Sequence, residues 1–234
     1  MQEVNETTQT NTEPAPTDPT HKQHVRAHLL SRLAAFAGIL VIGVIYLFLP
    51  ARLVIGPNWV LLAVEAVLIL PFLIVLFTRR SVPHGLLRTT ALVTLGVTTA
   101  ALAISIALLV SSLTEPTTKG LKLLREAGSL WVFNILVFAL WYFEVDGGGP
   151  FKRHLAAPEA TDFLFPQYTP GNKSNWKPQF FDYLFLAFNS STALSPADTL
   201  PLTKKAKALM MIQAALSLVI IILLAARAVN ILTP

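Results

Sequence analysis

The sequence predicts an all-α membrane protein, a polytopic helical bundle of about five transmembrane helices plus one re-entrant half-helix. The first observation is composition: of 234 residues, 53% are hydrophobic and only 13% are charged, whereas a soluble domain carries about 25% charged residues. The second is that the apolar residues form long blocks, close to the roughly 20 residues that a helix needs to cross a bilayer. The third is one apolar block of about a dozen residues near the C-terminus, which is too short to cross.

Residue counts exclude several classes of protein and partner. The chain has no cysteine, so disulfides, thiolate catalysis and cysteine-based metal sites are excluded. Its net charge of +5 comes from Lys and Arg residues that stand mostly in loops and at the ends of apolar blocks, where membrane topology alone places them. We therefore expect the lipid bilayer, and no nucleic acid, as a partner.

Changes in composition divide the chain into four parts. Residues 1–28 are polar, rich in Thr and Pro, and are expected to be a disordered tail. Residues 29–143 contain four transmembrane helices, residues 144–177 form a polar loop rich in Gly and Pro, and residues 178–234 contain the half-helix, a polar turn and the last transmembrane helix. The tail lacks the apolar core of a signal peptide. We expect a multi-pass protein of the plasma or inner membrane, anchored by its first span.

Each span has its own start and stop signals. Pro50 stops the first span, and Arg79 with Arg80 ends the second abruptly. The third is rich in small and hydroxyl residues, which suit close helix contacts, and Trp141 with Tyr142 marks the interfacial end of the fourth. The predicted spans are 33–49, 59–77, 89–110, 127–143 and 208–232.

The basic residues predict an orientation. Excess Lys and Arg on the cytoplasmic side favours a cytoplasmic N-terminus, and the excess depends on counting the long fourth connection, whose half-helix must return to its own side. The inner side then receives Lys22, Arg26, Arg32, Arg79, Arg80, Arg88 and the basic residues of that connection, and the outer side keeps Arg52, Lys119, Lys122, Arg125 and Arg227.

Three polar residues stand inside predicted spans. Glu65 lies near the middle of the second span, where a carboxylate costs roughly 2.5 to 3.5 kcal/mol on insertion scales and should face the bundle or a wet cavity. It is either an ion or proton site or a protonated, structural carboxyl, and the two interpretations are equally weighted. Asn134 in the fourth span is expected to hydrogen-bond a neighbouring helix. Arg227 near the end of the last span is expected to snorkel to the interface.

No residue pattern predicts catalysis. Glu144 and Asp146, followed by a glycine run, are suited to weak binding of a hard cation, but a solvated turn is the favoured interpretation. The sequence contains no zinc motif, no glycine-rich phosphate loop and no nucleophile paired with a base. We therefore expect no enzyme activity, no cofactor and no metal site.

The C-terminal part holds the most informative pattern, over residues 178–203. A short apolar helix, "QFFDYLFLAFNSSTA", leads to a polar turn and then to an extended return that contains proline. Asp182 lies in the first turn of this half-helix, where a carboxylate caps free N–H groups. Non-helical backbone at membrane depth is tolerated only when it is buried in protein or lines water. The candidate pore-loop or ion-path residues are Asn189, Ser190, Ser191, Thr192, Ser195, Asp198 and Thr199.

This pattern resembles the pore region of the potassium channel superfamily, in which a short helix leads to a Thr-rich filter, an acid, a proline and the last helix. Thr192, Asp198 and Pro201 match these places. The resemblance implies a homo-oligomer, a tetramer if the loop forms a pore. It fails at the filter, because "TALSPAD" has no glycine and Pro196 fixes φ in its middle. The predicted orientation also puts the loop on the cytoplasmic side, opposite to those channels.

The chain is more closely similar to a family of bacterial integral membrane proteins of unknown function. The resemblance covers about residues 165–232 and implies a fold rather than an activity. It rests on an "FP" before the half-helix, on the residues that begin the half-helix and on an A-x-x-V-N ending. The matching residues are Phe165, Pro166, Pro178, Phe181, Asp182, Tyr183, Leu184, Phe185, Ala226, Val229 and Asn230.

Three functions stay open on the sequence alone. The first is a channel-like protein with a degenerate, less selective pore loop. The second is a non-conducting scaffold or partner-binding subunit whose loop is sealed by side chains. The third, for which the sequence offers least support, is a proton-coupled carrier that uses Glu65.

Overall fold

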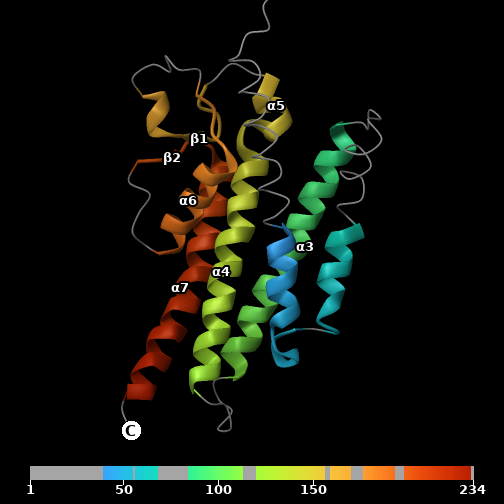
Figure 1. Ribbon diagram of the computed structural model, residues 1–234. Helices are drawn as coiled ribbons and strands as arrows, with labels where there is room; N and C mark the ends of the chain where they lie inside the picture. The colour runs from blue at the N-terminus through green and yellow to red at the C-terminus, as the bar shows by residue number, and fades with distance from the viewer. Residues whose placement is uncertain are drawn as a thin grey trace, which may run out of the picture.

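Long apolar helices dominate the molecule. The computed structural model describes residues 39–54, 56–67, 84–112, 120–155, 159–169, 176–192 and 198–232. These residues are mostly helical, and three of the described helices are long and apolar enough to cross a membrane (Figure 1). The three are α3 (His84–Ser111), α4 (Gly120–Val145) and α7 (Lys204–Leu232). At 1.5 Å per residue α4 is about 39 Å long, more than the hydrocarbon core of about 30 Å. This architecture is that of a membrane protein.

The first two predicted spans are described in part. An apolar helix, Ile39–Phe48, is followed by a short 3-10 helix, η1 (Ala51–Leu53), and by a helix over residues 59–67. The remainder of both predicted spans lies outside the described residues. Three of the five predicted spans therefore correspond to helices long enough to cross a membrane, and the other two stay predictions.

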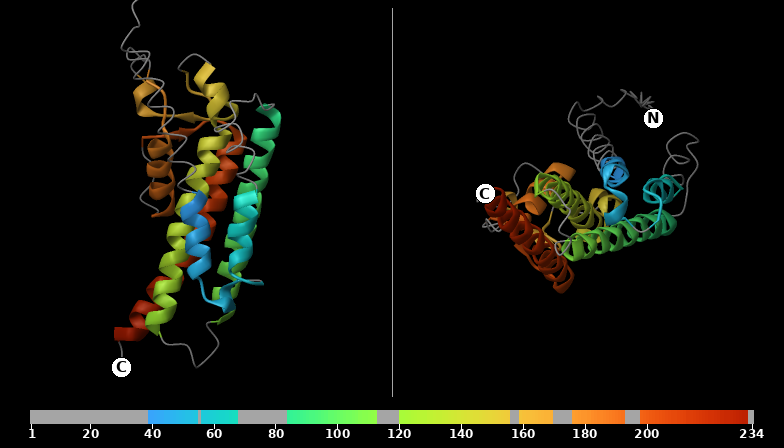
Figure 2. Two further views of the ribbon diagram at one scale, coloured as in Figure 1. Left: turned by 45° about the vertical axis from the view of Figure 1, so that its right-hand side comes forward. Right: turned by 90° about the horizontal axis from the view of Figure 1, so that it is seen from below.

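Helix α4 is the centre of the bundle. Within its most apolar stretch 61% of the residues are buried, against 39% for α3 and 22% for α7. Helices α3, α6 (Phe180–Ser191) and α7 all pack on α4, and Figure 2 shows α3 and α7 on different sides of it. The end of α7 leaves the bundle (Figure 1). Elements that meet α4 are therefore the ones that position polar side chains in the interior.

The connection between α4 and α6 is more regular than its Gly and Pro content predicts. It contains a 3-10 turn η3 (Asp146–Gly148), a short helix α5 (Pro150–Leu155), a strand β1 (Phe163–Leu164) and a 3-10 turn η4 (Pro166–Tyr168). Strand β1 pairs antiparallel with β2 (Leu200–Pro201), so the all-helical prediction omits a small sheet. The prediction of irregular structure failed because three glycines of the run have positive φ and let the chain reverse on itself.

Helix α6 begins and the chain returns at the same end of the bundle. Residues before α6 lie beside the end of α4, and β2 brings the chain back to β1 there (Figure 1). The C-terminus of α6 contacts α4 at Asn134. Asn134 is about 18 Å from Asp146 along the axis, because twelve residues at 1.5 Å per residue separate them. The short helix therefore reaches roughly half-way along α4.

Candidate functional site

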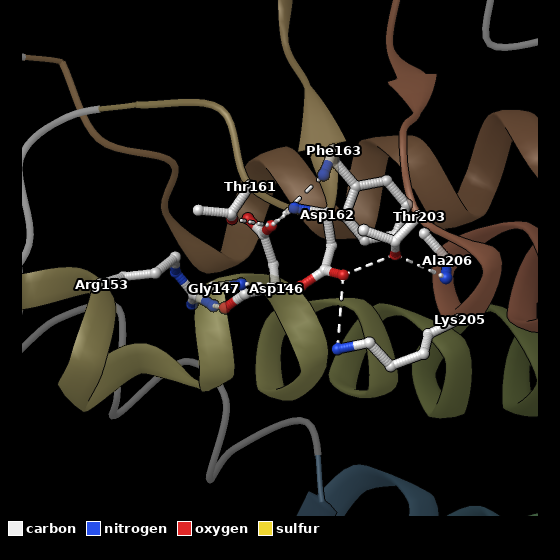
Figure 3. A network of polar contacts seen from close by, with 9 residues as sticks. All are labelled: Asp146, Gly147, Arg153, Thr161, Asp162, Phe163, Thr203, Lys205 and Ala206. Atoms are coloured by element: carbon white, nitrogen blue, oxygen red, sulfur yellow. Dashed lines mark hydrogen bonds and ion pairs between the residues drawn. The ribbon is translucent and has the colours of Figure 1, made fainter.

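Two groups of polar side chains, each with buried members, fasten the C-terminal half to α4. We call the first the aspartate cluster; it lies at the C-terminal end of α4, and Figure 3 shows all its members except Tyr183. We call the second the polar core; it lies deeper, where α6 ends. The aspartate cluster consists of Asp146, Arg153, Thr161, Asp162, Tyr183, Thr203 and Lys205, and the polar core of Asn134, Tyr142, Ser191, Gln213 and Ser217.

Asp146 is the acceptor at the centre of the aspartate cluster. It directly follows α4 and is 2% exposed. Its Oδ1 accepts hydrogen bonds from Thr161 Oγ1 at 2.6 Å and from the backbone N–H groups of Asp162 at 2.9 Å and Phe163 at 3.3 Å. Its Oδ2 accepts one from Tyr183 OH at 2.5 Å. The solvated turn predicted for Glu144 and Asp146 is therefore wrong at Asp146.

Asp162 is the second carboxylate acceptor of the aspartate cluster. Its Oδ2 accepts the backbone N–H of Gly147 at 3.0 Å, and its Oδ1 accepts Thr203 Oγ1 at 2.5 Å and lies 3.5 Å from Lys205 Nζ. The Thr203 hydroxyl also accepts the N–H of Ala206 at 3.3 Å, which caps the first turn of α7. Asp162 therefore joins the end of α4 to the start of α7 (Figure 3).

Arg153 donates to one carbonyl in the last turn of α4 and to one directly after the helix. The final C=O groups of a helix have no partner within the helix, and Arg153 Nη1 donates to the carbonyls of Phe143 at 2.6 Å and Asp146 at 2.5 Å. Its guanidinium also lies 5.0 Å from the ring centre of Phe143 and 5.1 Å from that of Tyr183, within the range of cation–π attraction. A cation at this place complements the negative end of the helix dipole.

The electrostatics of the aspartate cluster favour structure over chemistry. Each of its two carboxylates has several donors, so neither is left as a free base. Burial, together with the nearby charge of Asp146, raises the pKa of Tyr168 to about 12, and Tyr168 therefore stays neutral at physiological pH. The cluster holds α4, β1, α6 and α7 together.

The polar core anchors the C-terminus of α6. Gln213 Nε2 donates to the carbonyl of Ala187 at 2.8 Å and to Ser191 Oγ at 2.9 Å, and Gln213 Oε1 accepts the hydroxyl of Tyr142. Ser217 Oγ donates to the carbonyl of Ser191 at 2.6 Å, and a carbonyl there has no partner within α6. Tyr142 is fully buried, so the prediction that it marks an interface is wrong.

Asn134 joins the same network from α4. Its Nδ2 donates to Ser191 Oγ at 3.2 Å, which is the helix-to-helix bond that the sequence predicts for this residue. Its Oδ1 is buried and has no hydrogen-bond partner among the described residues. Only the amide nitrogen of Asn134 is therefore hydrogen-bonded, and its unpaired oxygen lowers the stability that the residue contributes.

The predicted pore-loop residues differ in burial and in hydrogen bonding. Ser191 is 1% exposed and lies in the polar core. The hydroxyls of Ser190 and Thr192 donate to carbonyls of their own helix, at 2.9 Å to Leu186 and at 3.2 Å to Phe188. Asn189 is half-buried, Thr199 is buried and Asp198 is exposed. Ser195 lies outside the described residues.

The remaining candidates are not part of either cluster. Asp182 forms a capping box at the start of α6: its Oδ2 accepts the N–H of Gln179 at 2.7 Å, and the Gln179 side chain accepts the N–H of Asp182 in turn. Glu65 is 1% exposed and its carboxylate has no hydrogen-bond partner among the described residues. The side chain of Arg227 lies outside the described residues. Across the described ranges, no three His, Asp or Glu side chains are placed to hold a metal ion.

Sequence reasoning missed the aspartate cluster. The signals were present as an acid directly after an apolar block, a glycine triplet next to it and a Thr-Asp pair before an aromatic run. A Cβ at Gly147 would lie 2.8 Å from Arg153 Cγ and 3.1 Å from Thr161 Oγ1. The glycine therefore allows the side chains around the acid to close on it.

Fold and site together define a helical membrane protein in which a short helix is fastened by buried polar contacts between two long ones. Comparison with protein-family models, with curated proteins and with solved structures gives no match to this chain. The function is therefore inferred from the geometry.

Proposed function

We propose that the chain is a multi-pass protein of the plasma or inner membrane in which α6 is a re-entrant half-helix sealed inside the bundle, and that it serves as a non-conducting scaffold or partner-binding subunit. One observation carries the proposal: the hydroxyls of Ser190, Ser191 and Thr192 are all engaged within the chain. A filter needs such groups directed at the ion. Here Ser191 joins α6 to α4 and α7, and the hydroxyls of Ser190 and Thr192 donate to carbonyls of α6 itself.

The burial of Ser191 supports the same function. Its side chain is covered by Asn134 of α4 and Gln213 of α7, and both contacts come from the chain itself. Water would have to displace these bonds to open a path at that depth. Buried polar contacts between membrane helices stabilise the association of the helices.

A conducting pore is the second candidate, and a different observation favours it. The C-terminus of α6 carries the negative end of the helix dipole, which attracts cations, and Asn189 nearby is half-buried rather than buried. Asp198, at the start of the return to β2, is exposed. In a symmetric oligomer these residues would face one another around an axis.

The two functions are separated by cation flux in liposomes that contain the purified protein. We expect no flux above that of protein-free liposomes, with folding checked by the thermal transition of the re-extracted protein. A flux that falls in Asp198→Asn or Thr192→Ala would contradict the proposal and establish the pore. A flux that neither substitution changes would show a leak outside the loop. A tetramer with residues 189–200 on its axis would support the conducting pore.

A further inference from the structure

Glu65 is a buried carboxyl that belongs neither to the aspartate cluster nor to the polar core. It stands in the helix over residues 59–67 and packs against the helix Ile39–Phe48 at Gly43. A Cβ at Gly43 would lie 2.4 Å from Oε2 of Glu65 and 2.6 Å from Cδ1 of Leu62. The absence of a side chain at Gly43 is therefore what gives the carboxyl its place.

Neither of the two described helices that meet at Gly43 brings a charged group to this carboxyl. The helix Ile39–Phe48 contains no Lys, Arg, His, Asp or Glu, and Glu65 is the only ionisable residue among 59–67. Tyr46, the titratable group of the facing helix, packs its ring on Phe133 with centroids 6.2 Å apart. Arg52 in the intervening turn forms an ion pair with Glu126.

A carboxylate in these surroundings cannot recover the hydration that it loses on burial. An unpaired ion in an apolar medium is far costlier than the neutral form of the same group, so such a group neutralises instead. An ionisable residue inside a membrane lowers stability, and such residues usually serve a function. The neutral form of a carboxyl is a carboxylic acid, which holds one exchangeable proton.

We propose that Glu65 is a proton-binding site within the bundle, a carboxylic acid held neutral against Gly43, and that hydrophobic carbodiimides modify it. In that reaction the acid O–H adds across one C=N bond of the reagent, so that the oxygen bonds to the central carbon and the proton goes to nitrogen. The acyl group then shifts from oxygen to nitrogen and gives a stable N-acylurea. No group leaves and nothing is oxidised, so the protein gains the mass of one reagent molecule.

The test uses the full-length protein in membranes, treated with dicyclohexylcarbodiimide and digested for mass spectrometry. We expect the peptide that contains Glu65 to gain one reagent mass, and we expect Glu65→Gln to lose this modification. Glu126 is the internal comparison, since it has the same side chain and is 5% exposed, but is engaged by Arg52. Its peptide should stay unmodified, and Glu126→Gln should label at Glu65 as the wild type does.

Three results would overturn the proposal. They are an unmodified Glu65 in the folded protein, modification that appears only after denaturation, and equal modification of Glu126, which would show that the reagent reports access alone. The site is read directly from the wild-type peptide, so the outcome does not depend on whether Glu65→Gln folds.

The role of Gly43 has its own test, with a water-soluble carbodiimide as the probe. In Gly43→Ala the new Cβ would lie closer to Oε2 than van der Waals contact allows, so the carboxyl must turn away, and we expect Glu65 to label several-fold faster with this reagent. Gly96→Ala is the matched control, because a Cβ there meets nothing within 4 Å. Equal labelling in the two variants would remove Gly43 as the residue that positions the acid.

Discussion

At the scale of single residues, the number of donors around Asp146 sets its importance. Four donors converge on a carboxylate that is 2% exposed. In Asp146→Asn one acceptor oxygen becomes an NH2 group, so at least one of those donors faces another donor. A buried group left without its partner costs about 1–3 kcal/mol. We expect this loss in the free energy of unfolding, measured by denaturant titration in detergent micelles.

Glu159→Gln is the control for Asp146→Asn. Glu159 lies in the same connection but is exposed, and surface substitutions usually change stability by less than about 0.5 kcal/mol. Equal losses in the two variants would show that the hydrogen bonds of Asp146 do not stabilise the fold.

The residue scale also shows where the sequence is informative. Asn134 and Asp182 could be interpreted correctly because their roles depend on the helix in which each one stands. Asp146 could not, because its partners come from 15 to 37 positions away and an acid after an apolar block looks the same when it is solvated. Long-range pairing of this kind leaves no local pattern.

At the scale of elements, α4 is the main packing partner of α6, but the C-terminus of α6 receives more hydrogen bonds from α7 than from α4. Gln213 of α7 donates two hydrogen bonds to α6 and accepts one from Tyr142 of α4. Gln213→Leu leaves the Tyr142 hydroxyl buried without this acceptor, and we expect it to cost about 1–3 kcal/mol of unfolding free energy. Asn134→Leu loses one bond of 3.2 Å but also removes an unpaired carbonyl oxygen. We expect that variant to change stability by less than about 0.6 kcal/mol, the average for such bonds in membranes.

The two leucine variants are compared by denaturant titration under the same detergent conditions, and each serves as the control for the other because both put a leucine in place of a fully buried amide. A loss in Asn134→Leu as large as that in Gln213→Leu would show that α4 and α7 hold α6 equally.

Elements were predictable where length and hydropathy decide them. The third, fourth and last predicted spans coincide with α3, α4 and α7, with ends that differ by at most seven residues. The half-helix coincides with α6, because proline before it and a capping acid within it mark its start. The connection before α6 could not be predicted, because its short elements form around Asp146 and Asp162 and not through their own propensities.

At the scale of the whole molecule, charge is distributed unequally between the two ends of the bundle. Described basic residues at the end that holds the aspartate cluster are Arg88, Lys152, Arg153, Lys177, Lys204, Lys205 and Lys207, and those at the other end are Arg52, Lys122, Arg125 and Arg227. Basic residues concentrate on the cytoplasmic side of membrane proteins. The same rule that favours a cytoplasmic N-terminus from the sequence therefore predicts that the aspartate cluster faces the cytoplasm.

This orientation and the re-entrant path of α6 are tested together with single cysteines in a chain that has none of its own. Gln167 and Asp198 flank α6, are exposed and lie at the end of the aspartate cluster, whereas Lys122 is exposed at the other end. We expect a membrane-impermeant maleimide to label Gln167→Cys and Asp198→Cys in inside-out vesicles only, and Lys122→Cys in right-side-out vesicles only. Labelling of the first two from opposite sides would mean that the chain crosses the membrane between them, which twelve helical residues, about 18 Å, are too short to do. Labelling of both from the outside would leave α6 re-entrant and reverse the orientation.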